Sequence, residues 1–146
     1  MTRARVLRQT GAKAIIRTKR IVAGKGRHRI YGILTTTDRG IIAIVIGGEV
    51  PHIGSIAVAV RGEPTGTKKG NLAVSVYTIS GHKDNRVAVP IARDISIASN
   101  RTSTVIAGIH VNSATKKDIA IVLRNSRELS RRMQRLLVEM FKTKDE

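Results

Sequence analysis

The sequence predicts an α+β fold, in which a mainly antiparallel sheet of about six strands carries two helices packed on one face. Up to about residue 79, short runs rich in β-branched residues are separated by glycine-containing turns, whereas apolar residues recur mainly with helical spacing afterwards. No linker and no internal repeat divides the 146 residues, a length that suits one core. We therefore expect a basic N-terminal arm over residues 1–11 and a single α+β domain over residues 12–146.

Strands are expected wherever a β-branched run lies between turn residues. The turns at 24–26 and 38–40 separate the first three runs, and the spacing is typical of antiparallel strands joined by short connections. The third run is apolar at every position, so we expect it to lie in the centre of the sheet. The five runs span residues 12–23, 28–37, 41–46, 55–60 and 72–79.

Two helices and one more strand follow. Residues 84–99 have helical apolar spacing, and a short sixth strand is expected at 104–107. Because the first helix is a crossover connection, the sixth strand should run parallel to the fifth. Thr115 and Asp118 form the capping-box pattern of a helix start, and a long apolar stripe follows with arginines around it.

The charge of the chain is strongly positive. Its 27 Lys and Arg residues against 10 Asp and Glu give a formal net charge of +17, which attracts nucleic acid, phosphorylated ligands or acidic proteins. The chain has no cysteine, which excludes disulfides and thiolate chemistry. The longest apolar run, 41–46, is too short to span a bilayer as a helix, and no apolar signal segment follows the basic start. We expect a cytoplasmic protein with no membrane partner.

Three histidines should meet at one edge of the sheet. In a meander the third and fifth strands end at the same edge, and the crossover brings the sixth strand there too. The loops that leave these strands are 48–54, 81–84 and 108–112, and each contains one histidine, whereas His28 lies elsewhere. The alternative is that these histidines are ordinary loop residues that form local hydrogen bonds.

This edge is expected to bind an anionic ligand, because the N-termini of both helices also lie there. Lysines lie in or beside the first turns, and the glycines next to the histidines allow backbone to approach a ligand closely. The candidate ligand-binding residues are His52, Gly54, Gly81, His82, Lys83, Gly108, His110 and Lys116.

Neither catalysis nor metal binding is expected from the motifs present. The chain lacks a nucleophile elbow, a phosphate-binding P-loop and any recognisable nucleophile–base–orienter set, so we expect a protein that is not an enzyme. The histidines lack the helical H-x-x-x-H or short H-x-H spacing that favours zinc. Asp84, next to the second loop histidine, is interpreted as the cap of the first helix.

The three loops also carry a family resemblance. The segments 47–59 (GGEVPHIGSIAVA), 81–84 (GHKD) and 108–111 (GIHV) together resemble the prenylated-flavin-chaperone-like family of small prokaryotic proteins. The resemblance spans roughly residues 12–140 and implies a fold like that of proteasome assembly chaperones. It further implies a homodimeric accessory protein without chemistry of its own, which binds prenylated FMN or FMN as cargo and serves a flavin-dependent decarboxylase. His52, His82 and His110 would then belong to the cargo site.

Two other functions remain open from the sequence. The +17 charge and the basic arm favour a nucleic-acid-binding protein, although the 2% aromatic content leaves little for base stacking. A homodimeric structural subunit is the other alternative, in which the end of the last apolar stripe, from Met133 to Met140, extends past what the sheet covers and forms an association surface.

Overall fold

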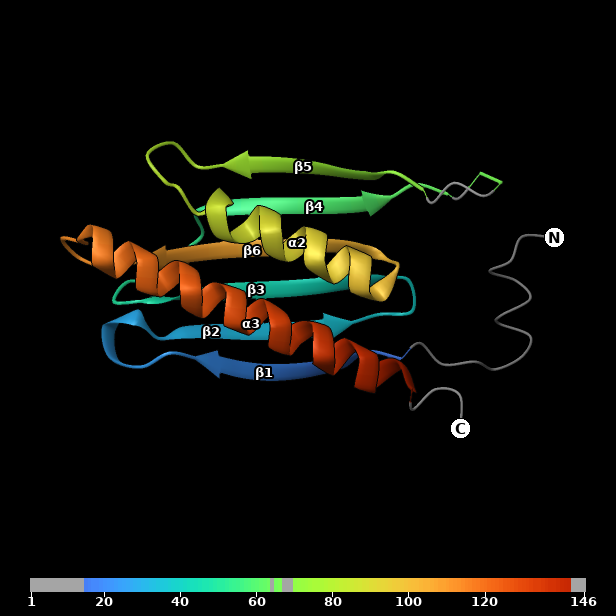
Figure 1. The fold of residues 1–146 in the computed structure, drawn as a ribbon, viewed down its shortest axis with the longest axis horizontal. Coiled ribbons are helices and arrows are strands. Elements are labelled where there is room, and N and C mark those ends of the chain that lie inside the picture. Colours follow the sequence, from blue (N-terminus) through green and yellow to red (C-terminus); the bar gives the residue numbers. More distant parts are fainter. Residues whose placement is uncertain (1–14, 64, 67–69, 143–146) are drawn as a thin grey trace.

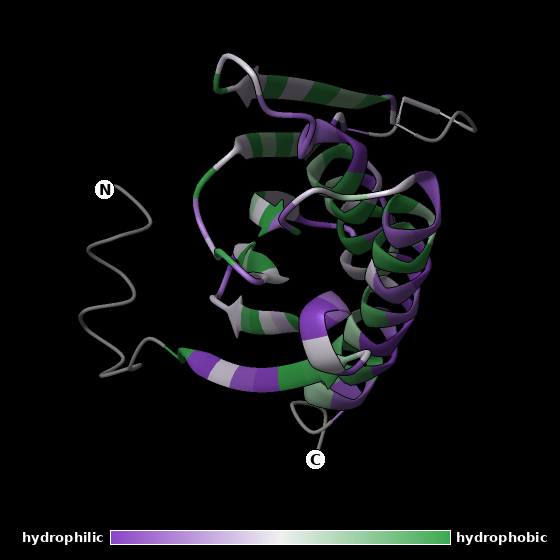
Figure 2. Ribbon diagram, turned by 90° about the vertical axis from the view of Figure 1, so that its left-hand side faces the viewer, coloured by the Kyte–Doolittle hydropathy of each residue, from purple (hydrophilic) through white to green (hydrophobic). Residues whose placement is uncertain are grey.

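The computed structural model describes residues 15–63, 65–66 and 70–142, so the basic arm expected over residues 1–11 lies outside the described residues. A single six-stranded sheet carries two helices on one face, which confirms the predicted α+β class (Figures 1 and 2). The strands are β1 (Arg17–Ala23), β2 (Ile30–Thr36), β3 (Gly40–Gly48), β4 (Ser55–Arg61), β5 (Leu72–Thr78) and β6 (Thr102–His110). The helices are a short 3-10 turn η1 (Gly26–His28), α2 (Asn85–Ser99) and α3 (Lys116–Lys142).

The strand order is β1-β2-β3-β6-β4-β5, which corrects the predicted meander. Strand β6 pairs in parallel with β3 and antiparallel with β4, so it separates two strands that were expected to be neighbours. It is also longer than the expected 104–107, because pairing on both sides continues to its ends. Since β4 is antiparallel to both β5 and β6, strands β3, β5 and β6 still point toward the same edge, as predicted.

Both helices pack on the same face of the sheet. Helix α2 lies over β4 and β6, α3 lies over β1 and β2, and the two helices contact each other (Figure 1). The core between the helices and the sheet is aliphatic. Ile30 and Leu34 of β2 and Ile91 of α2 are nearly inaccessible to solvent. Gly32 on β2 allows α3 to pack closely against the sheet, because a Cβ at this position would lie only 2.7 Å from the Cε of Met133. Burying such side chains contributes about 1.5–3 kcal/mol each.

Helix α3 begins with the predicted capping box. The amide and hydroxyl of Thr115 donate to Oδ2 of Asp118 at 2.8 and 2.9 Å, and the amide of Asp118 donates back to the Thr115 hydroxyl at 3.2 Å. The helix is 27 residues long, yet its buried side is only one stripe, which includes Leu129 and Leu137. Neither α3 nor any other helix in the described part of the chain has the length and apolarity needed to cross a bilayer.

Among the described residues, no helix packs on the opposite face of the sheet (Figure 2). Strand residues alternate between the two faces, so the side chains between the buried ones point to this open face. Several of them are large and apolar, and we call this set the open-face patch. It comprises Val22, Tyr31, Ile42, Ile56, Val60 and Tyr77, whose exposed fractions range from 36% for Ile56 to 71% for Tyr77.

Candidate functional site

The three loop histidines converge at the edge where β3, β5 and β6 end, which confirms the geometric prediction. The ring centre of His52 lies 4.6 Å from that of His82 and 6.3 Å from that of His110. Nε2 of His52 is 3.0 Å from Nδ1 of His82. His28 lies apart from them, as expected, and contacts Asp118 instead.

The loop 49–54 lies along the end of β6 and brings His52 into place. Backbone amides of Glu49 and Gly54 donate to the carbonyls of His110 and Ala107 at 2.7 and 2.9 Å. The carboxylate of Glu49 accepts the amide of Asn112 at 3.0 Å and pairs with Arg27 at 3.3 Å, which ties the same loop to the segment after β6.

Two of the candidate glycines serve the approach of the protein's own loops. A Cβ at Gly108 would lie 1.6 Å from the carbonyl oxygen of His52, and one at Gly54 would lie 1.9 Å from Oδ2 of Asp84. The third, Gly81, adopts φ +83° in the turn before α2, a conformation that favours glycine, and no atom blocks the space beside it. The glycines thus have a steric reason that does not involve a ligand.

Asp84 joins this cluster, and its interpretation as a helix cap was wrong. It occupies the N-cap position of α2, but its side chain forms no capping hydrogen bond. Oδ1 instead accepts the backbone amide of Ile109 at 2.9 Å, and Oδ2 lies 3.1 Å from Nε2 of His52 and 3.7 Å from Nδ1 of His82. Asp84 is only 7% exposed, so its carboxylate is committed to these partners.

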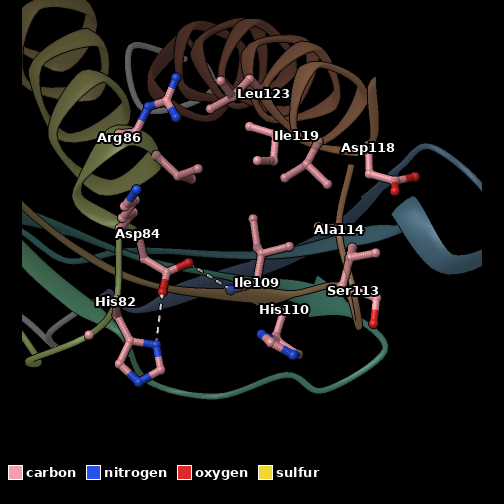
Figure 3. A pocket seen from close by; sticks show the side chains of 15 residues that line it. His82, Asp84, Arg86, Ile109, His110, Ser113, Ala114, Asp118, Ile119 and Leu123 are labelled. Atoms are coloured by element: carbon pink, nitrogen blue, oxygen red, sulfur yellow. Dashed lines mark hydrogen bonds and ion pairs between the residues drawn. The ribbon is translucent and has the colours of Figure 1, made fainter. Parts of the chain in front are cut away.

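A cavity of about 370 Å³ opens between α2, α3 and the end of β6 (Figure 3). Of the candidate residues, Gly81, His82, Lys83 and His110 line it, whereas His52, Gly54, Gly108 and Lys116 lie outside its wall. The rest of the wall was not among the candidate ligand-binding residues. It consists of Asp84, Arg86, Val87, Ile109, Val111, Ser113, Ala114, Asp118, Ile119, Val122 and Leu123.

The apolar part of this wall comes largely from the first turns of α3. Ile119, Val122 and Leu123 line the cavity and recur at i, i+3 and i+4. Figure 3 shows Ile119 and Leu123 across the cavity from Ile109 of β6. Their membership of the helix stripe was visible in the sequence, but a stripe alone does not tell a cavity wall from a packed core. Ile119 is 42% exposed, so the apolar stripe of α3 starts before the part of the helix that is buried in the core.

Cationic side chains, rather than free helix amides, supply the positive charge of the cavity. The first amides of α2 are already used, since those of Arg86 and Val87 donate to the carbonyls of Lys83 and Asp84 at 3.1 and 3.0 Å. The Lys83 and Arg86 side chains are exposed at the rim. The positive charge at this edge therefore comes from these two side chains and not from the α2 amides of Arg86 and Val87.

The N-terminus of α3 already holds a negative charge. Hydrogen bonds from the backbone amide of Thr115, from His28 and from the Thr115 hydroxyl hold the pKa of Asp118 well below its usual range. The His28–Asp118 contact is short, at 2.7 Å between Nε2 and Oδ1. Asp118 lines the cavity, and its carboxylate is bonded to Thr115 and His28.

Comparison with known proteins identifies the family of this chain. Residues 24–137 match the family model described as the prenylated flavin chaperone LpdD-like domain, and the chain belongs to this family. Among relatives, Protein LpdD of Lactiplantibacillus plantarum is 29% identical over 106 residues, which cover 73% of this chain and 75% of LpdD. The match contains all three histidine loops, and the resemblance seen in the sequence is confirmed.

A solved structure shares the fold. The crystal structure of a novel chaperone complex for yeast 20S proteasome assembly contains a chain that matches with a TM-score of 0.51 at 17% identity, over 82% of this chain and 98% of that one. At this identity the likeness concerns the fold alone. Family membership supports a chaperone-like accessory protein and not an enzyme, as predicted.

Proposed function

We propose that this protein binds a phosphorylated flavin, prenylated FMN or FMN, in the cavity between α2 and α3 and delivers it to a flavin-dependent decarboxylase. The observation that carries the proposal is a cavity of about 370 Å³ with an apolar wall and a cationic rim, at the edge where the three histidine loops meet, in a chain of the prenylated flavin chaperone LpdD-like family. That volume falls in the usual range for small-molecule sites, about 300–1,000 Å³.

The two ends of a flavin nucleotide suit different parts of this cavity. The aliphatic side chains of Val87, Ile109 and Val122 present an apolar surface for the fused rings. Lys83 and Arg86 at the rim would form charge-assisted hydrogen bonds with the phosphate. His82 would contact the polar edge of the ring system.

The open rim favours release of the cargo as much as its capture. His82, Lys83, Arg86 and His110 are all exposed, so bound cargo would remain accessible to a partner enzyme. A carrier benefits from such a site, because a ligand that is only partly enclosed dissociates faster than a buried one. The decarboxylase is the partner that this cargo implies.

Titration of the purified protein with FMN and prenylated FMN, by calorimetry and fluorescence, tests the proposal. Ile119→Trp should abolish binding by filling the cavity, whereas Ile97→Trp, at an isoleucine 55% exposed on α2, should leave binding intact. Removing both rim cations with Lys83→Ala and Arg86→Ala should weaken binding by about 100-fold or more, since each charged hydrogen bond contributes about 1.5–3 kcal/mol and every 1.4 kcal/mol is a factor of about ten. Unchanged affinity in Ile119→Trp would exclude the cavity.

We further propose that the chain forms a homodimer through the open-face patch. The patch draws its residues from five of the six strands, and none of these residues is charged, in a chain of net charge +17. Two strongly positive copies repel each other, so they would associate most readily through a surface that lacks charge. Burial of exposed apolar patches of this kind is a common driving force of association.

Nucleic-acid binding is a second candidate, favoured by one feature of α3. Arg124, Arg127, Arg131 and Arg135 are exposed and recur with helical spacing, so they form one cationic stripe. Phosphate contacts of this kind weaken steeply with salt. Retention of a labelled duplex that is independent of salt concentration, or unaffected by changing these arginines to glutamine, would exclude this function.

A further inference from the structure

We propose that His52, His82 and Asp84 form a binding site for a divalent transition-metal ion of the zinc class. Three atoms able to donate an electron pair converge there: Nε2 of His52, Nδ1 of His82 and Oδ2 of Asp84. Their separations are 3.0, 3.1 and 3.7 Å. Two ligands held tetrahedrally at about 2.0–2.2 Å from zinc lie about 3.3–3.5 Å apart, so this triangle has the size of one face of a coordination tetrahedron.

The tautomer of His52 points to the same conclusion. Its Nδ1 lies 3.0 Å from the carbonyl oxygen of Val50, and because a carbonyl only accepts, Nδ1 carries the hydrogen. Nε2 of the neutral ring then holds a lone pair that faces the Asp84 carboxylate. A hydrogen on Nδ1 of His82 can satisfy Nε2 of His52, but it leaves the carboxylate oxygen 3.1 Å from that lone pair with no hydrogen between them. A positive charge between these atoms, either a proton on Nε2 of His52 or a metal cation among the three, resolves this conflict, and it is the size of the triangle that favours the metal.

The surroundings hold the ligand atoms as metal sites require. A histidine ligand almost always donates its second N–H to a carbonyl or carboxylate, as His52 does to Val50. The other oxygen of Asp84 accepts the Ile109 amide at 2.9 Å, which fixes the carboxylate against β6. Gly54 leaves room for this contact, since a Cβ there would collide with Asp84.

This site goes beyond the proposed flavin cavity but adjoins it. His82 and Asp84 also line the cavity, so the ion would lie at its rim, with at least one coordination position left for water or for an anionic group of a bound ligand. The sequence argument against a metal rested on the absence of short histidine motifs. It does not apply here, because the ligands come from two loops that are 30 residues apart in sequence.

Zinc titration by calorimetry into the full chain, dialysed against a chelator and free of flavin, tests the site, with Co²⁺ as a coloured probe. We expect one ion per chain, visible Co²⁺ bands, and affinity that falls on acidification because the imidazoles must be deprotonated. Since second-shell changes alone cost about 10- to 100-fold, loss of a ligand in His82→Ala should weaken binding more than about 100-fold. Asp84→Asn, which retains an acceptor for Ile109, should do the same.

His28→Ala is the matched control, because it removes an imidazole that pairs with Asp118 away from the cluster. Its zinc affinity should equal that of the wild type. The side chain of His82 is 37% exposed, so His82→Ala should fold even if Asp84→Asn does not. The proposal is overturned if zinc does not bind saturably, or if His82→Ala binds it as tightly as the wild type. Since no flavin is present, either result leaves the flavin proposal untouched.

Discussion

Gly54 lies at the point where the side chains of the histidine cluster meet the backbone. It lies two residues after His52, at the end of the loop 49–54, and its amide donates to the Ala107 carbonyl of β6. Any side chain at this position would intrude between Asp84 and His52, because both lie within 3.0 Å of where a Cβ would be. The absence of a side chain at Gly54 therefore allows Asp84, at the start of α2, to approach His52.

Gly54→Ala should accordingly destabilise the protein by about 1–3 kcal/mol, the usual cost of forcing extra volume into a packed site. Gly40→Ala is the matched control, because a Cβ there meets nothing closer than 3.5 Å. The free energies of unfolding are to be compared by urea denaturation. Equal free energies of unfolding for the two variants would contradict this prediction, because they would mean that the loop can move to accommodate a Cβ without loss of stability.

Asp84 shows why part of the site was hidden in the sequence. An aspartate just before a helix is usually a cap, and this local rule is sound on average. The actual partner of Asp84, the amide of Ile109, lies 25 residues further along the chain. The histidines were easier to predict, because strand direction alone places their loops at one edge of the sheet.

At the level of elements, the position of strand β6 within the sheet is what the sequence did not predict. Apolar periodicity indicated the six strands, the two helices and the strand directions, and these were confirmed. The lateral order was wrong, because β6 lies between β3 and β4. Its pairing with β3 joins residues such as Ile44 and Ile106 that are far apart in sequence, and periodicity says nothing about such nonlocal choices.

The first turn of α3 provides a prediction at this same level. The folded protein holds the pKa of Asp118 below its usual range, so its contribution to stability is present above the unfolded value, about 3.9, and is lost as pH falls. The stability difference between wild type and Asp118→Asn should therefore shrink below about pH 4. Glu128→Gln, on the exposed side of the same helix, corrects for the loss of one negative charge. A difference that stays constant down to pH 2 would contradict this account.

At the scale of the whole molecule, the two faces of the sheet differ in their exposure to solvent. One is covered by α2 and α3, whereas the other exposes the open-face patch (Figure 2). The sequence indicated that β3 is apolar on both sides but could not assign the outer side to a partner. It suggested the end of α3 as an association surface instead, yet Met133, Leu137 and Met140 are buried against the sheet.

If the open-face patch is the dimer interface, Ile42→Asp should convert the protein to monomers, because it buries an unpaired charge at a cost of several kcal/mol. Light scattering after size-exclusion chromatography measures the mass directly. Ile97→Asp, an equally drastic change on the helical side, should leave the dimer intact. A wild type that is monomeric at high concentration, or an Ile42→Asp variant that stays dimeric, would rule out this interface.

The most direct test of the central proposal is to record amide chemical shifts of the labelled protein during titration with FMN and prenylated FMN. We predict saturable shifts at Ile109, Ile119 and Leu123 in the cavity wall and at Lys83 on its rim, with no change at Ile42 or Tyr77 on the open face. Absence of saturable shifts with either flavin, or shifts confined to the open face, would contradict the assignment of the cavity as the cargo site.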